Sequence, residues 1–288
     1  MFRLAHLSDL HLYPPGAMAP WHWLGRRAFG ALNLFAARVG VHSLDVARAA
    51  VEAVREAGVD HVVVTGDIGN LALDDEFALG VDVLSPLGGF DRLSVVPGNH
   101  DYYTPESVQA RRFERHFGHW LWPEGEGTWP AVKDFGPVRL ILACSAAVPP
   151  PLFASGWIGP GQAQHIRQAA DRPRRQGAFT VLALHHNLHR RGPVNEVQGR
   201  LVDRERVLDT LRNHPIDLAL YGHDHRPRDW TLPRQDGGTV RMICGGSTSF
   251  HDPKRGREGG FHVYSIDQGR LSVEHWRYRP EDHRFTPE

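Results

Sequence analysis

Short runs of apolar residues alternate with amphipathic stretches along most of this chain. The runs are rich in Val, Leu, Ile and Ala and are bounded by turn-forming residues, a pattern typical of buried strands. A tight turn at Asp267-Gln268-Gly269 joins the last two runs into a hairpin. We predict strands at residues 2–7, 61–65, 92–96, 138–144, 180–184, 217–221, 239–244, 261–266 and 271–278.

Between these runs, apolar residues recur with the spacing of one face of a helix. The clearest case is residues 43–57, where Ser43 can cap the first turn and Gly58 can end the helix. Residues 21–39 show a fair helical pattern with aromatic residues and three arginines. We also predict helices at residues 74–84, 106–117, 161–175 and 203–213.

The alternation of strands and helices predicts an α/β fold, and the late hairpin predicts mixed rather than wholly parallel sheets. The chain has 288 residues, about the upper limit for a single core. We therefore expect one domain over residues 1–288. Residues 14–42 and 102–135 depart from the pattern and are expected to be cap insertions.

Composition narrows the class of protein. Lys plus Arg is 33 and Asp plus Glu is 33, so the formal net charge is zero. This balance argues against a protein that binds a nucleic-acid polymer. The chain shows no signal-peptide pattern and no apolar stretch of membrane-spanning length, so we expect a cytoplasmic location. The 19 histidines are the unusual feature.

Several of the histidines stand in five polar clusters, each directly after an apolar run. Active sites of such sheets lie beyond the carboxyl ends of the strands, so we expect the clusters to meet there. Each cluster alone is common in turns, but the five together are not. The clusters are Asp9-x-His11, Gly66-Asp67, Gly98-Asn99-His100-Asp101, His185-His186-Asn187 and Gly222-His223-Asp224-His225.

These clusters offer carboxylate, amide and imidazole ligands in numbers that suffice for two metal ions sharing one ligand. The mixed nitrogen and oxygen set suits Mn, Fe, Co or Zn better than Mg or Ca. Two metals roughly 3.5–4 Å apart can bind a bridging hydroxide and clamp a phosphate for in-line attack. The sequence therefore predicts a hydrolytic site with two divalent transition-metal ions.

The order of the five motifs resembles that of the calcineurin-like metallophosphoesterase superfamily. The resemblance spans Asp9 to His225 and implies a four-layer αββα fold, in which two mixed sheets pack face to face with helices outside. It also implies roles. Asp9, His11 and His225 would hold one metal, Asn99, His185 and His223 the other, and Asp67 would bridge them. His100 would act as general acid or charge stabiliser, with Asp101 as a candidate partner that orients it.

One motif departs from the pattern of many relatives, in which the lone metal-binding His is followed by one residue and then Pro. In this chain the corresponding sequence is His185-His186-Asn187. Aligning Asn187 with that Pro makes His185 the ligand, and His186 remains the alternative. His186, Arg190 and Arg191 are also candidate substrate contacts, for a second phosphate or a nucleotide, although a solvated loop would explain the arginines equally well.

The resemblance extends to class III cyclic-nucleotide and glycerophosphodiester phosphodiesterases, which favours hydrolysis of a small phosphodiester. An alternative is cleavage of the pyrophosphate of a lipid-linked nucleotide sugar, as in UDP-2,3-diacylglucosamine pyrophosphohydrolases. The aromatic and basic residues of 14–42 favour this alternative, because such a segment could contact a lipid surface instead of capping the site. A phosphomonoesterase and a metal-binding scaffold without catalysis are further alternatives.

Overall fold

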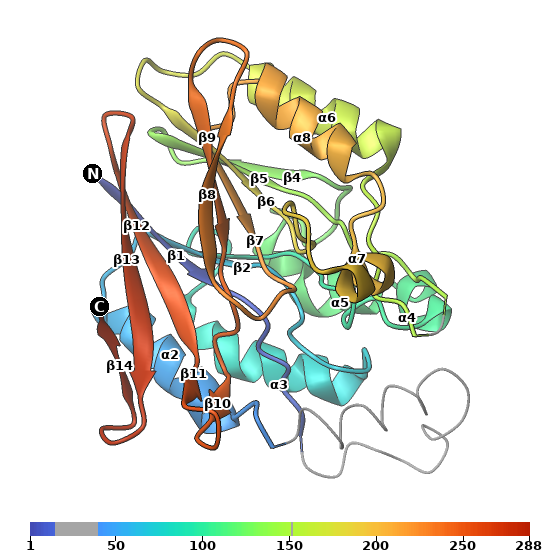
Figure 1. Cartoon of the computed structure of the whole chain (residues 1–288), viewed down its shortest axis with the longest axis vertical. Coiled ribbons are helices and arrows are strands. Elements are labelled where there is room, and N and C mark those ends of the chain that lie inside the picture. The colour runs from blue at the N-terminus through green and yellow to red at the C-terminus, as the bar shows by residue number, and fades with distance from the viewer. Residues whose placement is uncertain (15–39, 151) are drawn as a thin grey trace.

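The computed structural model describes residues 1–14, 40–150 and 152–288. Two six-stranded sheets lie between layers of helices, with α2 and α3 below and α6 and α8 above in Figure 1. This is the four-layer α/β arrangement expected from the sequence. The predicted helix at 21–39 and most of the predicted insertion at 14–42 lie outside the described residues.

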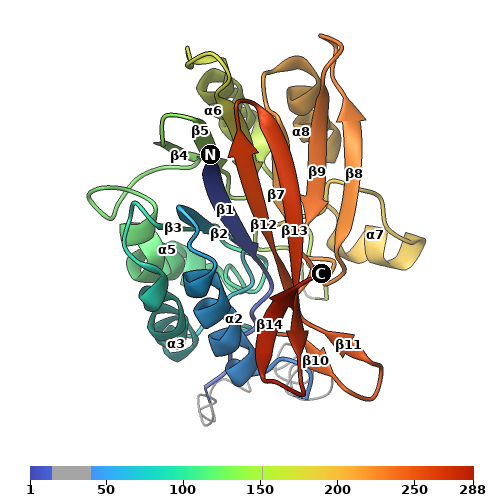
Figure 2. The ribbon, with the colours of Figure 1, turned by 90° about the vertical axis from the view of Figure 1, so that its left-hand side faces the viewer.

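The first sheet has the strand order β14-β13-β12-β1-β2-β3. Its first strand pairs in parallel with β2 and antiparallel with β12, where Phe2 lies opposite Ile266. The first strand, which is largely buried, therefore lies beside a strand from near the end of the chain (Figure 2). The strands are β1 Phe2–Leu7, β2 His61–Val64, β3 Leu93–Val95, β12 Gly260–Asp267, β13 Arg270–Arg279 and β14 Arg284–Pro287.

The second sheet has the order β4-β5-β6-β7-β9-β8. Its four inner strands are parallel, and one antiparallel strand lies at each edge. Strands β10 His251–Asp252 and β11 Arg257–Glu258 form a separate short pair. The strands of the second sheet are β4 Ala131–Asp134, β5 Val138–Leu142, β6 Phe179–Ala183, β7 Leu218–Tyr221, β8 Arg228–Pro233 and β9 Thr239–Cys244.

Alternate residues of the second sheet pack in two different hydrophobic cores, one on each face of the sheet. In β5, Leu140 and Leu142 pack in the core shared with the first sheet, whereas Ile141 packs in the core shared with α6 and α8. This period of two is what a strand buried on both faces requires. The helices are α2 Leu44–Glu56, α3 Asp74–Leu84, α4 Pro105–Gln109, α5 Arg112–Phe117, α6 Gly159–Asp171, α7 Pro193–Gly199 and α8 Arg204–Asn213, with short 3-10 turns at Ser85–Leu87 and Gly118–Trp120.

Two predicted helices differ from the observed ones for local reasons. The helix predicted at 106–117 is divided into α4 and α5, because Arg111 adopts a left-handed conformation with φ of 46°. The helix predicted at 161–175 ends at Asp171. Arg172 is extended, with ψ of 139°, because the Pro173 ring disfavours helical geometry in the residue before it.

Residues 102–135, predicted as a cap, contribute largely to the core of the first sheet. Phe113, Phe117 and Trp120 are almost fully buried there, with at most 2% of each side chain exposed. Tyr103, by contrast, lines a cavity at the strand ends. Among the described helices, none combines the length and the apolar composition needed to cross a bilayer.

Candidate metal centre

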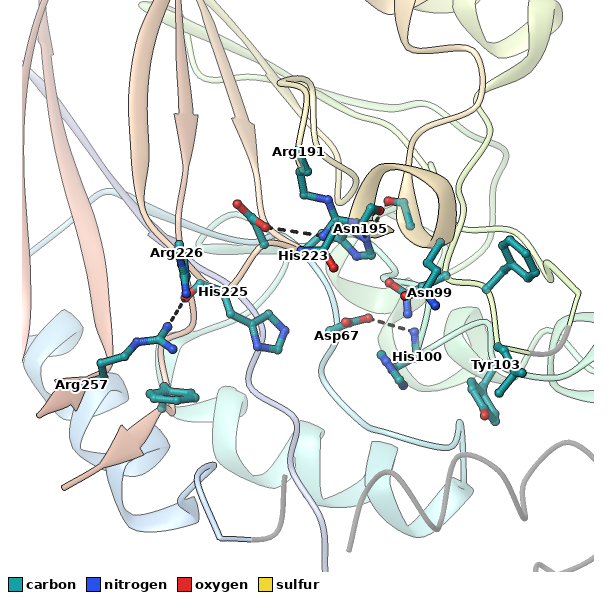
Figure 3. Close-up of a pocket in the computed structure, with 17 residues that line it drawn as sticks. Asp67, Asn99, His100, Tyr103, Arg191, Asn195, His223, His225, Arg226 and Arg257 are labelled. Carbon is teal, nitrogen blue, oxygen red and sulfur yellow. Dashed lines mark hydrogen bonds and ion pairs between the residues drawn. The ribbon is translucent and has the colours of Figure 1, made fainter. Parts of the chain in front are cut away.

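The five polar clusters meet at one end of the two sheets. Asp9 and His11 follow β1, Asp67 follows β2, and Asn99 and His100 follow β3. From the second sheet, the clusters after β6 and β7 reach the same place. Figure 3 shows Asp67, Asn99, His100, His223 and His225 around one cavity. The expected convergence of strand ends is thus present.

The backbone at these clusters is unusual. Asp9, His11, Asp67, His223 and His225 all have left-handed conformations, with φ of 52°, 46°, 53°, 72° and 52°. An L-residue in this region is disfavoured by roughly 1–2 kcal/mol. The alternation of polar residues therefore does not continue the strands. Instead, each side chain is placed by a sharp turn, and such strain is typical of functional sites.

Glycines allow the two loops around Asp67 to touch. Gly66 has a φ of 90°, and a Cβ atom added to Gly98 would overlap the Asp67 carboxylate. The backbone N–H of His100 then donates to Asp67 Oδ1 at 2.9 Å. The orientation of this carboxylate is therefore fixed, with Oδ2 3.7 Å from His11 Nε2 and 3.5 Å from His185 Nε2.

A first group of candidate ligands comprises Asp9, His11, Asp67 and His225, whose ligand atoms all lie within 4.8 Å of one another. His225 Nε2 lies 3.2 Å from Asp9 Oδ1 and 3.0 Å from His11 Nε2. Burial would raise the pKa of Asp9, but His225, His185 and the Ser8 hydroxyl lower it to about 2. This buried carboxylate is therefore ionised at neutral pH.

A second group comprises Asp67, His185 and His223. His185 Nε2 lies 3.2 Å from Asn99 Oδ1 and 3.2 Å from His223 Nδ1. Asp67 belongs to both groups, which is the position that a bridging ligand requires. The structure thus brings together all seven residues that the sequence predicted as metal ligands.

The hydrogen-bond pattern of the second group fits a bound cation. His185 Nδ1 donates to Thr65 O at 2.6 Å, and His223 Nε2 donates to Gly199 O at 2.8 Å. Since a neutral imidazole carries one N–H, the lone pairs of both rings face one another beside the Asp67 carboxylate. A place where only acceptors converge suits a metal ion, and the outer carbonyls hold each ring in the required orientation.

His185, rather than its neighbour, joins the cluster. His186 is fully buried, with Nδ1 2.8 Å from Ser145 Oγ and Nε2 3.1 Å from Ala154 O. Burial holds the pKa of His186 well below its usual value. Its nitrogens are therefore engaged by the surrounding chain, and the structure favours neither the ligand role nor the substrate contact that the sequence left open for His186.

His100 lines the cavity, but a different group orients it from the one suggested by sequence. Its Nδ1 lies 2.8 Å from Asn70 O, and its ring stacks on Tyr103. The Asp101 carboxylate instead accepts N–H bonds from Ile68, Gly69 and Gly98, and so ties two site loops together. Burial, together with nearby Asp67, raises the pKa of Asp101 to about 7.

A buried polar chain supports Asp9 from behind. Ser8 Oγ donates to Asp9 Oδ2 at 2.6 Å and accepts from Thr65 Oγ1 at 2.8 Å. His6 continues the chain, with Nε2 2.8 Å from Thr65 Oγ1 and Nδ1 3.2 Å from the Tyr264 hydroxyl. Burial lowers the pKa of His6 to about 3, so the ring is neutral. The hydrogen bonds then all run in one direction: the Tyr264 hydroxyl donates to His6, His6 to Thr65, Thr65 to Ser8 and Ser8 to Asp9.

The cavity above the cluster has a volume of about 500 Å³. Arg226 and Arg257 lie on one side of the cluster and Tyr103 on the other (Figure 3). Arg191 also lines the cavity, and its Nη1 lies 3.5 Å from Asp224 Oδ1. Arg190 is exposed and is not among the residues that line it.

Comparison with known families shows which family this chain belongs to. Residues 2–227 match the family model for calcineurin-like phosphoesterases. The chain belongs to this family. The predictions of a metallophosphoesterase and of a metal-dependent phosphoric ester hydrolase are thereby confirmed.

Individual relatives of this phosphoesterase are distant. It is 28% identical, over 82% of its length and 79% of the relative's, to a probable cyclic nucleotide phosphodiesterase from Synechococcus sp. strain WH7803. Its fold is similar to a dimetal phosphatase from Danio rerio, with 16% identity, a TM-score of 0.62 and 99% and 98% of the two chains covered. It is also similar to purple acid phosphatase PPD1 from yellow lupin, with 13% identity and a TM-score of 0.64, covering 96% of this chain but only 51% of the lupin chain.

Sequence reasoning missed several residues of the phosphoesterase site. Arg226 directly follows the last motif, and this adjacency was a usable signal. Arg257 and Tyr103 reach the cavity from β11 and from the loop after β3, where nothing in the pattern marks them. His42 lies outside every strand-end cluster, yet it stands beside His11 and His225.

Proposed function

We propose that this phosphoesterase hydrolyses small phosphodiesters with two bound divalent cations. One cation would be held by Asp9, His11 and His225, the other by Asn99, His185 and His223, and Asp67 would contact both. The donor set supports Mn, Fe, Co or Zn. The support is the convergence of buried carboxylate oxygens and imidazole lone pairs, which would repel one another without a cation.

The bound cations would supply positive charge that polarises the phosphate and lowers the pKa of an attacking water. The chain's own groups position the rest. Asp67 is held by the His100 N–H, so its free rotation is removed. The His100 ring donates through Nδ1 to Asn70 O, so Nε2 is the atom that, when the ring is protonated on both nitrogens, can give a proton to the leaving oxygen.

The shape of the cavity favours a diester over a monoester. It extends to both sides of the cluster, toward Arg226 and Arg257 on one side and toward Tyr103 on the other. An acyclic phosphodiester, such as a glycerophosphodiester, carries a separate substituent on each side of phosphorus, and each substituent can occupy one side of the cavity. Cyclic nucleotides and glycerophosphodiesters are the proposed substrate classes, and the name of the Synechococcus relative supports the first.

The test is a comparison of two chromogenic esters. Protein freed of metal and reloaded with Mn²⁺ should hydrolyse bis-p-nitrophenyl phosphate with a higher kcat/KM than p-nitrophenyl phosphate. Metal-free protein is the control and should be inactive on both. A strong preference for the monoester would overturn the diesterase proposal. A panel of cyclic nucleotides, glycerophosphodiesters and nucleotide-sugar lipids then identifies the class.

The pyrophosphohydrolase alternative rested on residues 14–42, of which 15–39 lie outside the described residues. Selective hydrolysis of UDP-2,3-diacylglucosamine in the panel would favour it over the diesterase. The lipid contact of this segment, the cytoplasmic location and the lack of a nucleic-acid partner stay predictions.

A further inference from the structure

His42 enters the site from an unexpected part of the chain. It lies just before α2, where residues 41–43 run antiparallel to residues 249–251, with His42 opposite Phe250. Two backbone hydrogen bonds hold this pairing, from Ser43 N to Ser249 O at 3.0 Å and from His251 N to Val41 O at 2.8 Å. The backbone of His42 is therefore fixed against the core.

The His42 ring stands among the candidate ligands of the first group. Its centroid lies 4.6 Å from that of His11 and 5.5 Å from that of His225. Ligand atoms of these three histidines all lie within 4.8 Å of one another, as do those of Asp9, His11, Asp67 and His225. His11 and His225 are common to both sets, so His42 lies beside two of the candidate ligands of the first group.

The hydrogen bonds of His42 determine which nitrogen can coordinate. Ser249 Oγ donates its single hydrogen to Leu10 O at 2.6 Å. At the 2.9 Å contact with His42 Nδ1, Ser249 Oγ must therefore accept, so Nδ1 carries the N–H. The lone pair then belongs to Nε2. His185 and His223 show the same arrangement, in which one nitrogen donates to a protein oxygen and the other serves the cluster.

We propose that His42 is an additional imidazole ligand of the cation that Asp9, His11 and His225 would hold, with Ser249 orienting its ring. This inference rests on the proposed two-metal function. The first cation then has three imidazoles and two carboxylates, whereas the second has two imidazoles, one carboxylate and one amide. Because the first set has more donors and more imidazoles, the two sites should bind Co²⁺ or Zn²⁺ with unequal affinity.

The test is direct metal binding by the full-length protein. Metal-free wild type and His42→Ala are titrated with Co²⁺, followed by calorimetry and by the visible absorption of the bound ion. In His42→Ala, the tighter of the two binding steps should weaken by at least about a hundredfold, because loss of a group that only orients a ligand already costs roughly 10–100-fold. Its absorption bands should change, while the other step keeps its affinity. Ser249→Ala should weaken the same step by a smaller factor.

The matched control is His251→Ala, because His251 lies close by in the chain but its Nδ1 pairs with Glu258 Oε2 at 2.6 Å. This variant should bind Co²⁺ like the wild type. Equal thermal unfolding of the metal-free proteins confirms that His42→Ala is folded, and His42→Gln provides a second variant of similar volume.

The outcomes separate the two proposals. If His42→Ala and His42→Gln keep both affinities and the wild-type spectrum, His42 is no ligand, and a rise in KM alone would assign it to the substrate. If the wild type itself binds fewer than two Co²⁺ ions, the two-metal function fails, whatever the variants do.

Discussion

Five residues of the candidate metal centre have left-handed backbone conformations, and substitution of one of them can measure the strain that this conformation carries. In metal-free protein, His225→Gly should be more stable than His225→Ala by about 1 kcal/mol, because glycine adopts a φ of 52° without the Cβ penalty that alanine keeps. Urea unfolding in the presence of a chelator measures the difference. Equal stabilities of the two variants would show that the turn carries no strain.

His100 offers a second test at the level of one residue. His100→Ala should lower kcat for a diester by roughly 10²–10⁴, because the group that can protonate the leaving oxygen is lost. The content of bound metal should stay at the wild-type value, since His100 belongs to neither ligand group. His214→Ala, at a surface pair with Asp171, is the control and should keep full activity. Loss of metal from His100→Ala would contradict the assigned role.

The candidate ligands could be read from the sequence because they share one signal, a polar residue directly after a buried strand. His42 carries no such signal. It is brought to the cluster by pairing with Phe250, more than two hundred residues away in the chain. The support of His100 by the Asn70 carbonyl was equally hidden, because a backbone carbonyl is present at every position and only folding selects one.

At the scale of single elements, the first turn of α3 contains a buried carboxyl group, that of Glu76, whose pKa is raised. Glu76 Oε2 accepts N–H bonds from Leu71 and Leu73, and burial raises the pKa of Glu76 to about 7. The folded state therefore holds a proton that the unfolded chain releases near pH 4.5. The stability that this proton contributes is complete below pH 4.5 and is lost as pH rises to about 7.

Glu76→Gln tests this linkage, because glutamine keeps an acceptor oxygen but does not titrate. The unfolding free energy of wild type minus that of Glu76→Gln should fall between pH 4.5 and about 7, by on the order of 3 kcal/mol, and then level off. Chemical denaturation across this range measures it. A difference that is constant with pH would contradict the raised pKa.

Three of the strands that the sequence pattern did not predict share a location. Strands β4, β8 and β14 lie at sheet edges, where only one side of the strand is paired. In β8, only Leu232 is buried, so the strand carries almost no apolar pattern. The central strands were predictable because both of their faces are buried, as the fully buried β6 shows. Strand β3 was predictable although it lies at an edge, because all three of its residues are buried.

On the scale of the whole molecule, each ligand group takes residues from both sheets. The first combines Asp9 and His11 of the first sheet with His225 of the second, and the second combines Asp67 with His185 and His223. Bound metal would therefore connect the two sheets. At a free metal concentration a hundred times the Kd, one site adds about 2.7 kcal/mol of stability, so a chelator should lower Tm by several degrees.

A variant that lacks the shared ligand is the control for this effect. Asp67→Ala disrupts both groups, so a chelator should change its Tm little. Differential scanning calorimetry with and without chelator compares the two proteins. An equal shift in wild type and Asp67→Ala would mean that the chelator acts elsewhere.

The pairing of β1 with β12 also sets an order of events during synthesis. Strand β1 gains its neighbour β12 only after Ile266, the partner of Phe2, has been synthesised. The ligand group of Asp9 is complete only after His225 has been synthesised. A chain still attached to the ribosome at residue 222 carries neither full set of ligands. A product truncated before residue 223 would therefore lack one ligand of each proposed metal ion.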